Sequence, residues 1–255
     1  MRALALPEIR RHRDAAELAA AGAALVAARL TEAIAARGRA SLVLSGGSTP
    51  QPLHRALAGC AIDWGAVHIY FGDERCVPPD DPASNYRMAR ETLLDVVSVP
   101  EANVHRIRGE DDPAAAAVAY ERVVRGVLRT PTGPPRDAPG ARFDLILLGL
   151  GDDGHTASLF PDTATLHDRP CWVRAAYVPA VSMWRITLTP IIINAAAEVA
   201  FLVLGDAKAD VLRRVLEGPR RPRELPAQLI APVAGRVRWF VDAPAAAALH
   251  NTPGV

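Results

Sequence analysis

The 255-residue sequence contains almost no lysine. Its 29 basic side chains are 28 arginines and one lysine, Lys208, and 28 acidic residues bring the net charge to +1. A protein that binds nucleic acid or another polyanion normally carries a basic excess or a basic patch, so this balance argues against that class of function. Alanine runs at 114–117 and 245–248 show the same compositional drift. A lysine that survives such drift is a candidate functional residue.

Cysteine and long apolar runs are scarce as well. Cys60, Cys76 and Cys171 are an odd number without CxxC spacing, which indicates reduced thiols rather than a disulfide framework or a zinc site. No continuous apolar run approaches the roughly 18 residues that span a bilayer. Residues 1–14 lack the apolar core and cleavage site of a signal peptide. We therefore expect a cytoplasmic protein without a membrane segment.

Apolar strand-like runs alternate with helical patterns along the chain. Strands are expected at 41–45, 67–71, 143–148, 185–188, 199–204 and 237–241, and helices at 14–37, 49–58, 86–97, 113–128 and 207–217. This alternation predicts an α/β fold with a mainly parallel central sheet covered by helices on both sides. The proline-rich stretch 130–142 must be a loop. Because the alternation continues through it, we expect one domain over residues 1–255.

A glycine-rich turn follows the first of these strands, and ligands of open α/β sheets bind beyond such carboxyl ends. The turn consists of Gly46, Gly47, Ser48, Thr49 and Pro50. The two glycines let the backbone approach a ligand closely, and the hydroxyls of Ser48 and Thr49 can bond phosphate oxygens. Thr49 and Pro50 predict a hydroxyl-capped helix start. The same residues also fit a plain tight turn, and no Walker A spacing is present.

Three charged residues, Asp73, Glu74 and Arg75, follow the second strand. Burying such charges is unfavourable unless they are paired, so the segment is either a solvated turn or part of a pocket. In a pocket, Asp73 would position water or hydroxyl groups and Arg75 would counter developing negative charge.

The segment after strand 143–148 is the strongest catalytic candidate. Residues 149–158 read GLGDDGHTAS and include His155, with a helix-like run expected behind it. A histidine is well suited to act as a general base near neutral pH, which contributes about 10²–10⁴ in rate. A lone histidine is more often structural, but the surrounding glycines and carboxylates favour function. Asp152, Asp153 and His155 do not match a common zinc pattern, and no metal is expected.

Two later cations complete the candidate site. Arg185 begins a predicted strand, and Lys208 begins the predicted helix 207–217. Each alone fits an ordinary surface charge. Together with the glycine-rich turn they could hold a phosphate dianion, with charge-assisted contacts of about 1.5–3 kcal/mol each.

Six segments taken together resemble the 6-phosphogluconolactonase family. They are LSGGSTP (44–50), FGDERCVPPDDPASNYRMARE (71–91), LGLGDDGHTASLFP (148–161), RITLT (185–189), LGDAKADVL (204–212) and LPAQLI (225–230). The resemblance implies a Rossmann-like three-layer fold shared with sugar-phosphate deaminases and ribose-5-phosphate isomerases. It also implies hydrolysis of 6-phospho-D-glucono-1,5-lactone to 6-phosphogluconate in the oxidative pentose phosphate pathway, without metal or organic cofactor.

The resemblance also implies roles for single residues. His155 would be the general base, and Asp73 and Arg75 would line the reacting end. The phosphate and sugar site would contain Gly46, Gly47, Ser48, Arg185 and Lys208, with Thr49 beside them. Asp152-Asp153 stands where the family often has Glu-Asp, and residues 178–184 are a less typical approach to RITLT.

Two alternatives remain open. A sugar-phosphate deaminase or isomerase would share the fold, but the deaminases carry Asn-Glu-Pro after the Gly-His pair, where residues 158–161 read SLFP. A non-enzymatic sugar-phosphate sensor would need a DNA-binding helix-turn-helix, whereas residues 1–40 predict a single helix. The expected partner is a sugar-phosphate lactone, without nucleic acid or membrane. We expect a monomer, with a dimer as the alternative.

Overall fold

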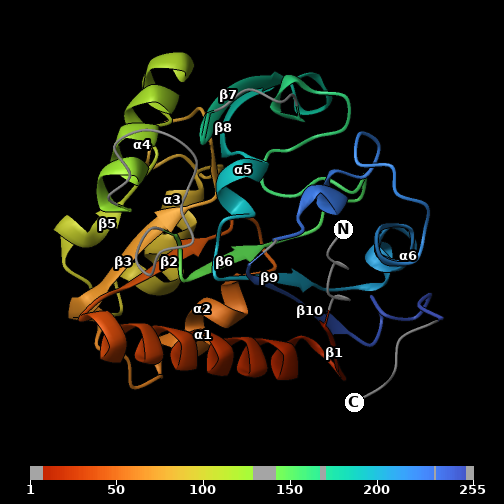
Figure 1. The fold of residues 1–255 in the computed structure, drawn as a ribbon, viewed down its shortest axis with the longest axis horizontal. Helices are drawn as coiled ribbons and strands as arrows, with labels where there is room; N and C mark the ends of the chain where they lie inside the picture. The colour runs from red at the N-terminus through yellow and green to blue at the C-terminus, as the bar shows by residue number, and fades with distance from the viewer. Residues whose placement is uncertain (1–7, 129–141, 167–170, 233, 251–255) are drawn as a thin grey trace.

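A seven-stranded parallel sheet crosses the molecule in the order β1-β10-β9-β6-β2-β3-β5 (Figure 1). The structure is a computed structural model that describes residues 8–128, 142–166, 171–232 and 234–250. The strands of the sheet are β1 (Glu8–His12), β2 (Ala40–Leu44), β3 (Val67–Phe71), β5 (Val104–His105), β6 (Leu145–Leu148), β9 (Glu198–Val203) and β10 (Arg236–Asp242). The prediction of a mainly parallel central sheet is confirmed.

Helices cover both faces of this sheet. Helices α1 and α2 lie on one face, and α4 and α5 lie on the other together with a small second sheet (Figure 1). The helices are α1 (Ala15–Arg37), α2 (Gln51–Ala58), α3 (Asn85–Ala89), α4 (Pro113–Val127), α5 (Pro190–Ile193) and α6 (Ala209–Leu216). A π-helical turn, Arg90–Leu94, continues α3. The three-layer α/β architecture is therefore as predicted.

The second sheet is antiparallel, with the order β4-β8-β7. It consists of β4 (Asp73–Arg75), β7 (Val173–Val178) and β8 (Met183–Leu188). The prediction that residues 185–188 continue the parallel series was wrong, because β8 pairs antiparallel with both of its neighbours. The backbone N–H of Leu188 donates to the carbonyl of Gly72 at 2.8 Å. The small sheet is thereby joined to the carboxyl end of β3, where the candidate site begins.

Helix α1 begins and ends where the sequence predicts. The side chain of Asp14 accepts a hydrogen bond from the backbone N–H of Glu17 at 2.9 Å, and Gly38 ends the helix with φ at 72°. This is a side-chain cap at one end and a left-handed glycine at the other.

Among the described helices, α1 is also the one long and apolar enough, by length and composition, to cross a membrane. The expectation that no continuous apolar run approaches that length still holds, because Glu17 and Arg29 bound the apolar stretch of this helix. Its Leu18, Val26 and Leu30 are buried in the hydrophobic core. This burial is typical of the core helix of a soluble protein.

Two local predictions near the candidate site were wrong. Pro50, not Thr49, occupies the cap position of α2, and no side chain caps that helix. No α-helix follows His155 within the described stretch 142–166, which has only the short 3₁₀ helix Ala164–Leu166. Directly after His155, Thr156 and Leu159 form a tight bridge and Ala157 has φ at 48°. A left-handed residue of this kind interrupts a helix. The proline-rich stretch 130–142, except Arg142, lies outside the described residues.

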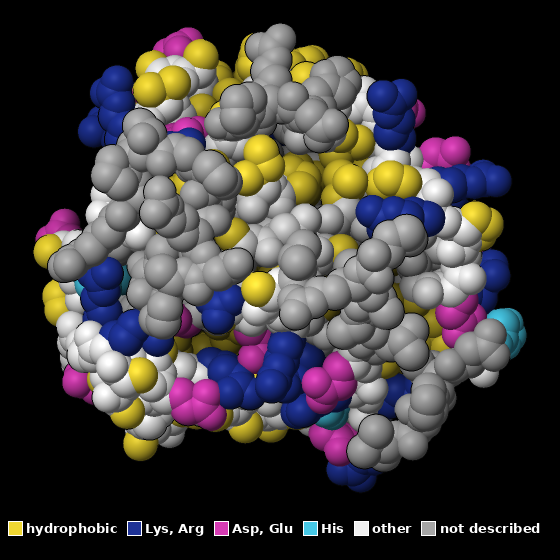
Figure 2. All heavy atoms as spheres, viewed as in Figure 1, with side chains coloured by type: hydrophobic (Ala, Val, Ile, Leu, Met, Phe, Trp, Pro, Cys, Tyr) yellow, Lys and Arg dark blue, Asp and Glu magenta, His cyan; other side chains and the backbone are white. Residues whose placement is uncertain are grey.

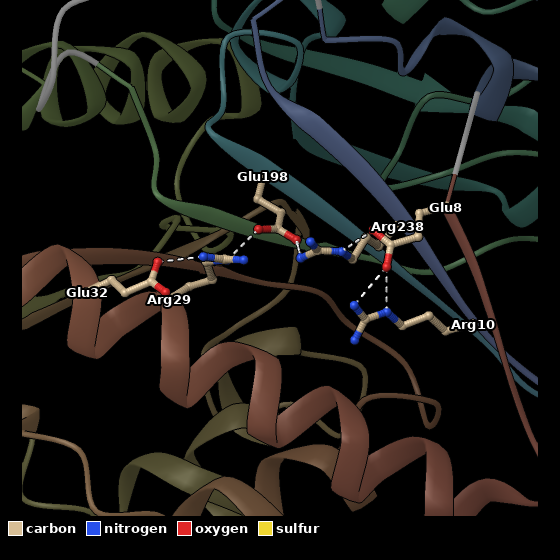
Figure 3. Close-up of polar contacts among 6 residues, drawn as sticks. All are labelled: Glu8, Arg10, Arg29, Glu32, Glu198 and Arg238. Atoms are coloured by element: carbon tan, nitrogen blue, oxygen red, sulfur yellow. Dashed lines mark hydrogen bonds and ion pairs between the residues drawn. The ribbon is translucent and has the colours of Figure 1, made fainter. Parts of the chain in front are cut away.

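A chain of ion pairs ties the edge strand β1 to the sheet and to α1 (Figure 3). Arg238 on β10 lies between Glu8 of β1, at 2.6 Å, and Glu198 of β9, and Arg29 of α1 reaches Glu198 at 2.7 Å. Arg238 is 5% exposed and Glu198 is 3% exposed. Because each buried charge has a partner of opposite sign, the network fixes the edge of the sheet without leaving an uncompensated charge.

Charges on the surface are mixed rather than segregated. On the face shown in Figure 2, Lys and Arg side chains are interspersed with Asp and Glu side chains. This agrees with the near-zero net charge of the chain.

Candidate functional site

The glycine-rich turn at the carboxyl end of β2 packs directly against a buried asparagine. A Cβ atom on Gly46 would lie 1.9 Å from Oδ1 of Asn85, so no larger residue fits at this position. Gly47 has φ at 87°, which favours glycine. Ser48 is exposed and Thr49 is half-buried in the same turn. The structure therefore requires both glycines, one for close approach and one for backbone conformation.

Asp73 is buried at the end of β3 and is held on both carboxylate oxygens. The hydroxyl of Ser158 donates to Oδ2 at 2.5 Å, and Nδ2 of Asn85 donates to Oδ1 at 3.1 Å. Asp73 is 7% exposed. The alternative of a solvated turn is thus wrong for Asp73, whose carboxylate joins the β3–β4 connection to the loop after β6 and to α3.

Glu74 supports this segment from below the site. It accepts hydrogen bonds from the backbone N–H groups of Arg75, Asn85 and Tyr86 at 2.7–2.8 Å and from the hydroxyl of Ser84 at 3.1 Å. Burial raises the pKa of Glu74, and these hydrogen bonds oppose that effect. The contacts fix the start of α3 relative to β4, the strand that carries Asp73 and Arg75.

Two arginines stand side by side on the small sheet. Arg75 of β4 is opposite Arg185 of β8, and Nε of each is buried without a partner among the described residues. Arg75 donates to the carbonyl of Ala83 at 2.5 Å. Burial lowers the pKa of Arg185, Asp73 opposes this, and the neighbouring Arg75 adds to it. An anion placed between the two guanidinium groups would relieve this repulsion.

Arg75 also lines a cavity of about 300 Å³ together with Gly47, Gln51 and Arg87. The cavity therefore connects the glycine-rich turn with the charged segment after β3. A larger cavity of about 470 Å³, between α6 and β10, contains none of the predicted site residues. The chemistry of the side chains, not cavity size, identifies the site.

His155 lies on the loop after β6 with its ring held from two sides. Its Nδ1 is 2.6 Å from Oδ1 of Asp153, and its ring stacks on Phe160 with centroids 4.0 Å apart. This network assigns the proton of neutral His155 to Nδ1, which leaves Nε2 as a proton acceptor. Partial burial would raise the pKa of Asp153, but its hydrogen bonds with His155 outweigh that effect and lower it.

The glycines of this loop are needed for the position of the ring. A Cβ atom on Gly151 would lie 2.0 Å from Nδ1 of His155, and the backbone N–H of Gly151 donates to the carbonyl of His155 at 2.8 Å. The carbonyl of Gly154 accepts from the backbone N–H of Ala227 at 2.9 Å. The segment that contains Ala227 therefore supports the loop from outside.

Lys208 occupies the cap position at the start of α6 and reaches the same loop. Its ammonium group is 2.5 Å from Oδ1 of Asp152. The Lys208 side chain is 21% exposed, whereas that of Asp152 is 80% exposed. The pair lies at the open edge of the site, where a bound anion can compete with the Asp152 carboxylate for the lysine.

The predicted residues form two groups that the loop 149–158 connects. One group surrounds Asp73 and the arginine pair, and the other holds His155 and Lys208 through Asp153 and Asp152. Of seven buried side-chain atoms without a partner in the described part of the chain, four belong to this site: Ser45 Oγ, Arg75 Nε, Asn85 Oδ1 and Arg185 Nε. No group of three or more His, Cys, Asp or Glu side chains among the described residues is arranged to hold a metal ion.

Residue type and spacing alone do not mark Asn85, Ser158 and Phe160 as part of the site. Asn85 and Ser158 are common polar residues in loops, and only their contacts with Asp73 distinguish them. The two segments that contain them were recognised as family motifs, which is the one signal in the sequence that points to them.

Known proteins with similar sequence and structure agree with the motifs. The family described as glucosamine-6-phosphate isomerases/6-phosphogluconolactonase matches residues 13–239. A Synechocystis sp. protein named 6-phosphogluconolactonase is 43% identical over 220 residues, which are 85% of this chain and 88% of the relative. The structure of 6-phosphogluconolactonase from Trypanosoma cruzi has a TM-score of 0.83 at 30% identity and covers 96% of this chain and 97% of its own.

A monomeric glucosamine-6-phosphate deaminase has a TM-score of 0.79 at 21% identity over 94% of this chain and 99% of its own, a similarity of fold alone. The family resemblance predicted from the motifs is confirmed: the chain belongs to the glucosamine-6-phosphate isomerase/6-phosphogluconolactonase family.

Proposed function

We propose that this protein hydrolyses 6-phospho-D-glucono-1,5-lactone to 6-phospho-D-gluconate, the second step of the oxidative pentose phosphate pathway. The observation that carries the proposal is the contact of Asp153 with Nδ1 of His155, which leaves Nε2 as a base on the same loop whose Ser158 bonds to the buried Asp73. Relatives named 6-phosphogluconolactonase over most of the chain support the choice of substrate.

In this mechanism the phosphate group anchors the substrate. Arg185, Lys208 and the glycine-rich turn provide cations and backbone N–H groups for it. Lys208 exchanges its contact with Asp152 for a contact with the substrate, which the exposure of Asp152 permits. Asp73, fixed by Ser158, accepts a hydrogen bond from a sugar hydroxyl or from the attacking water.

The chemical step is a proton transfer coupled to attack on the lactone carbonyl. Nε2 of His155 removes a proton from water as the oxygen of that water bonds to the carbonyl carbon. Arg75 or backbone N–H groups stabilise the oxyanion, an effect worth on the order of 10²–10³ in rate for one donor. The oxyanion then collapses, the bond from the carbonyl carbon to the ring oxygen breaks, and His155 returns its proton to that oxygen.

The test is lactone hydrolysis coupled to 6-phosphogluconate dehydrogenase and corrected for spontaneous ring opening. His155→Ala should lower kcat by about 10²–10⁴ with little change in KM, as expected for loss of a general base. His250→Ala removes an exposed histidine outside the site and is the matched control. If His155→Ala retains near-wild-type kcat, His155 is not the base.

The deaminase alternative gains no support from the site. In the position after the Gly-His pair, Ser158 donates to Asp73, and residues 158–161 provide no carboxylate for ring opening. Release of ammonia from glucosamine 6-phosphate would overturn our choice. The sensor alternative is also disfavoured, because the helix before β2 is α1, which packs into the core.

We further propose that residues 1–255 act as a single domain, as a monomer in the cytoplasm, without metal or organic cofactor and without nucleic-acid or membrane partners. The substrate class requires none of these partners. Light scattering of the purified protein separates a monomer from a dimer, and activity after exhaustive dialysis against a chelator tests the absence of a metal requirement.

A further inference from the structure

Asn85 is a buried amide that lies between the two backbone segments expected to hold the substrate. It is 2% exposed and begins α3. Its Nδ2 donates to the backbone carbonyl of Asp73 at 2.9 Å and to Oδ1 of the same residue at 3.1 Å. On its other side, the amide lies against Gly46. One side chain therefore contacts both the acidic residue after β3 and the glycine-rich turn after β2.

The orientation of this amide is determined by its neighbours. Both atoms of Asp73 that face Asn85 are acceptors, so the NH₂ group must point toward them. The oxygen Oδ1 is then buried without a partner among the described residues. Contacts that do not involve the amide already fix the backbone of Asn85, since its N–H donates to Glu74 at 2.7 Å and Ser84 caps α3. The amide is thus not required to start the helix.

The geometry points to Asn85 as a positioning residue for the lactone site, which holds the carboxylate of Asp73 in its working orientation. Ser158 restrains Oδ2 of Asp73 at 2.5 Å, and Asn85 restrains Oδ1. With one restraint removed, the carboxylate can rotate about its last bond and no longer presents a fixed acceptor. This inference rests on the proposed function, because it assigns Asp73 a role in that reaction.

The close fit between Asn85 and Gly46 extends the same role to the turn. A Cβ atom at residue 46 would overlap the amide oxygen, so the amide packs directly against the backbone of the turn. A displacement of about 1 Å in a reacting geometry can lower the rate about 10²-fold. Asn85 therefore couples the placement of the phosphate-binding turn to the placement of Asp73.

Two substitutions test the inference in the lactone assay. Asn85→Leu keeps the branched four-atom skeleton of the side chain and removes the donor, and should lower kcat by about 10- to 100-fold while the thermal unfolding midpoint stays within a few degrees. Asn85→Asp replaces the donor with an oxygen. Two facing carboxylates cannot both ionise easily, so at lower pH they share a proton that replaces the missing amide hydrogen.

The ratio of kcat for Asn85→Asp to kcat for wild type should therefore rise by about tenfold between pH 8 and pH 6. The charged groups around the pair are Glu74 and Arg75 on β4 and Arg185 on β8. They are present in both proteins, so the ratio of the two kcat values at each pH reports the effect of the introduced carboxylate. If Asn85 had only a structural role, the kcat ratio of Asn85→Asp to wild type would follow the stability of the variant and would not show this rise at lower pH.

Asn194→Asp is the matched control, because both amide atoms of Asn194 are bonded to the backbone outside the site, at Leu229 and Ala231. Its ratio to wild type should be flat over the same range. A flat ratio for Asn85→Asp, or wild-type kcat for Asn85→Leu, would overturn the inference while wild-type hydrolysis stands. Absence of lactone hydrolysis by the wild type would instead refute the proposed function.

Discussion

Asp153→Asn is the substitution that tests the catalytic reasoning most directly. The carboxylate of Asp153 is 2.6 Å from Nδ1 of His155 and also accepts from the backbone N–H of His155 at 3.0 Å. An asparagine in the same position can turn its NH₂ group toward Nδ1. Nδ1 of His155 would then accept a hydrogen bond instead of donating one, and the ring proton would move to Nε2. His155 would lose its ability to act as a base.

The expected loss of kcat in Asp153→Asn has two causes. Two unit charges about 4 Å apart interact by about 4 kcal/mol at an effective dielectric constant of about 20. The Asp153 side chain is 44% exposed, and solvent screening reduces the benefit to that of a charge-assisted hydrogen bond, about 1.5–3 kcal/mol. Loss of this support for the imidazolium lowers the rate about 10- to 100-fold. The wrong tautomer adds to this, so we expect a total loss of about 10²–10⁴ in kcat.

The neighbouring carboxylate provides the control. Asp152→Asn removes the same charge from the same loop, but Asp152 contacts Lys208 and not the imidazole ring. We expect Asp152→Asn to leave kcat within about twofold of wild type and to change KM, since a competitor for the lysine is removed. Steady-state hydrolysis of the phosphorylated lactone separates the two parameters. Equal kcat for Asp153→Asn and wild type would refute the assigned orientation of His155.

Three further predictions concern the cation site and stability. Lys208→Arg should raise KM for the phosphorylated lactone about tenfold and leave kcat unchanged, because a planar guanidinium differs in reach and shape from the ammonium. An unchanged KM would show that Lys208 does not contact the substrate. Glu198→Gln removes the buried carboxylate that pairs with Arg238 and Arg29 and leaves Arg238 with Glu8 alone. It should lower the free energy of unfolding by about 1.5–3 kcal/mol in urea titrations, whereas the exposed Glu32→Gln should cost less than about 1 kcal/mol. Burial lowers the pKa of His54 to about 4 from 6.5, so the unfolded state binds a proton first. Stability is then fully present above pH 6.5 and falls as the pH drops toward 4, by about 3 kcal/mol at most, and His54→Leu should abolish that part of the slope.

The sequence was sufficient for the inner strands of the central sheet because these strands are buried on both faces. Every residue of strands β2, β6 and β9 is buried, and all of these residues except Ser41 and Glu198 are apolar. Helices separate the three strands along the chain. The rule that ligands bind beyond the carboxyl ends of parallel strands then selected Gly46, Asp73 and His155 for the site. Each of these residues lies after a strand of the sheet, as predicted.

Elements without a local apolar signal were missed. Strand β1 has the sequence EIRRH, and its pairing with β10 depends on contact with residues about 230 positions away. Strand β4 is three charged residues long, and its partner β8 lies more than 100 residues further along the chain. Long-range pairing decided both, and no periodicity within either segment could indicate it.

The same limit applies to the site. A pattern of residue types indicated candidate side chains for the chemistry, but not which contacts hold them. Ser158, which donates a hydrogen bond to Asp73, is 85 residues from it in the sequence. Asp152, which pairs with Lys208, is 56 residues from the lysine. The distinction between Asp152, which contacts Lys208, and Asp153, which contacts His155, came only from the structure.

The loop after β6 makes these contacts interdependent. Within seven residues it supplies Asp152 to the lysine, Asp153 to the catalytic histidine candidate, and Ser158 to Asp73. A shift of the loop therefore alters the cation, the base and the acidic residue together. Substitutions in these three contacts should be non-additive, because the first that displaces the loop already removes part of what the others would remove. A double-mutant cycle of Asp153→Asn with Ser158→Ala measures this coupling, and strict additivity in kcat would show that the loop holds its residues independently.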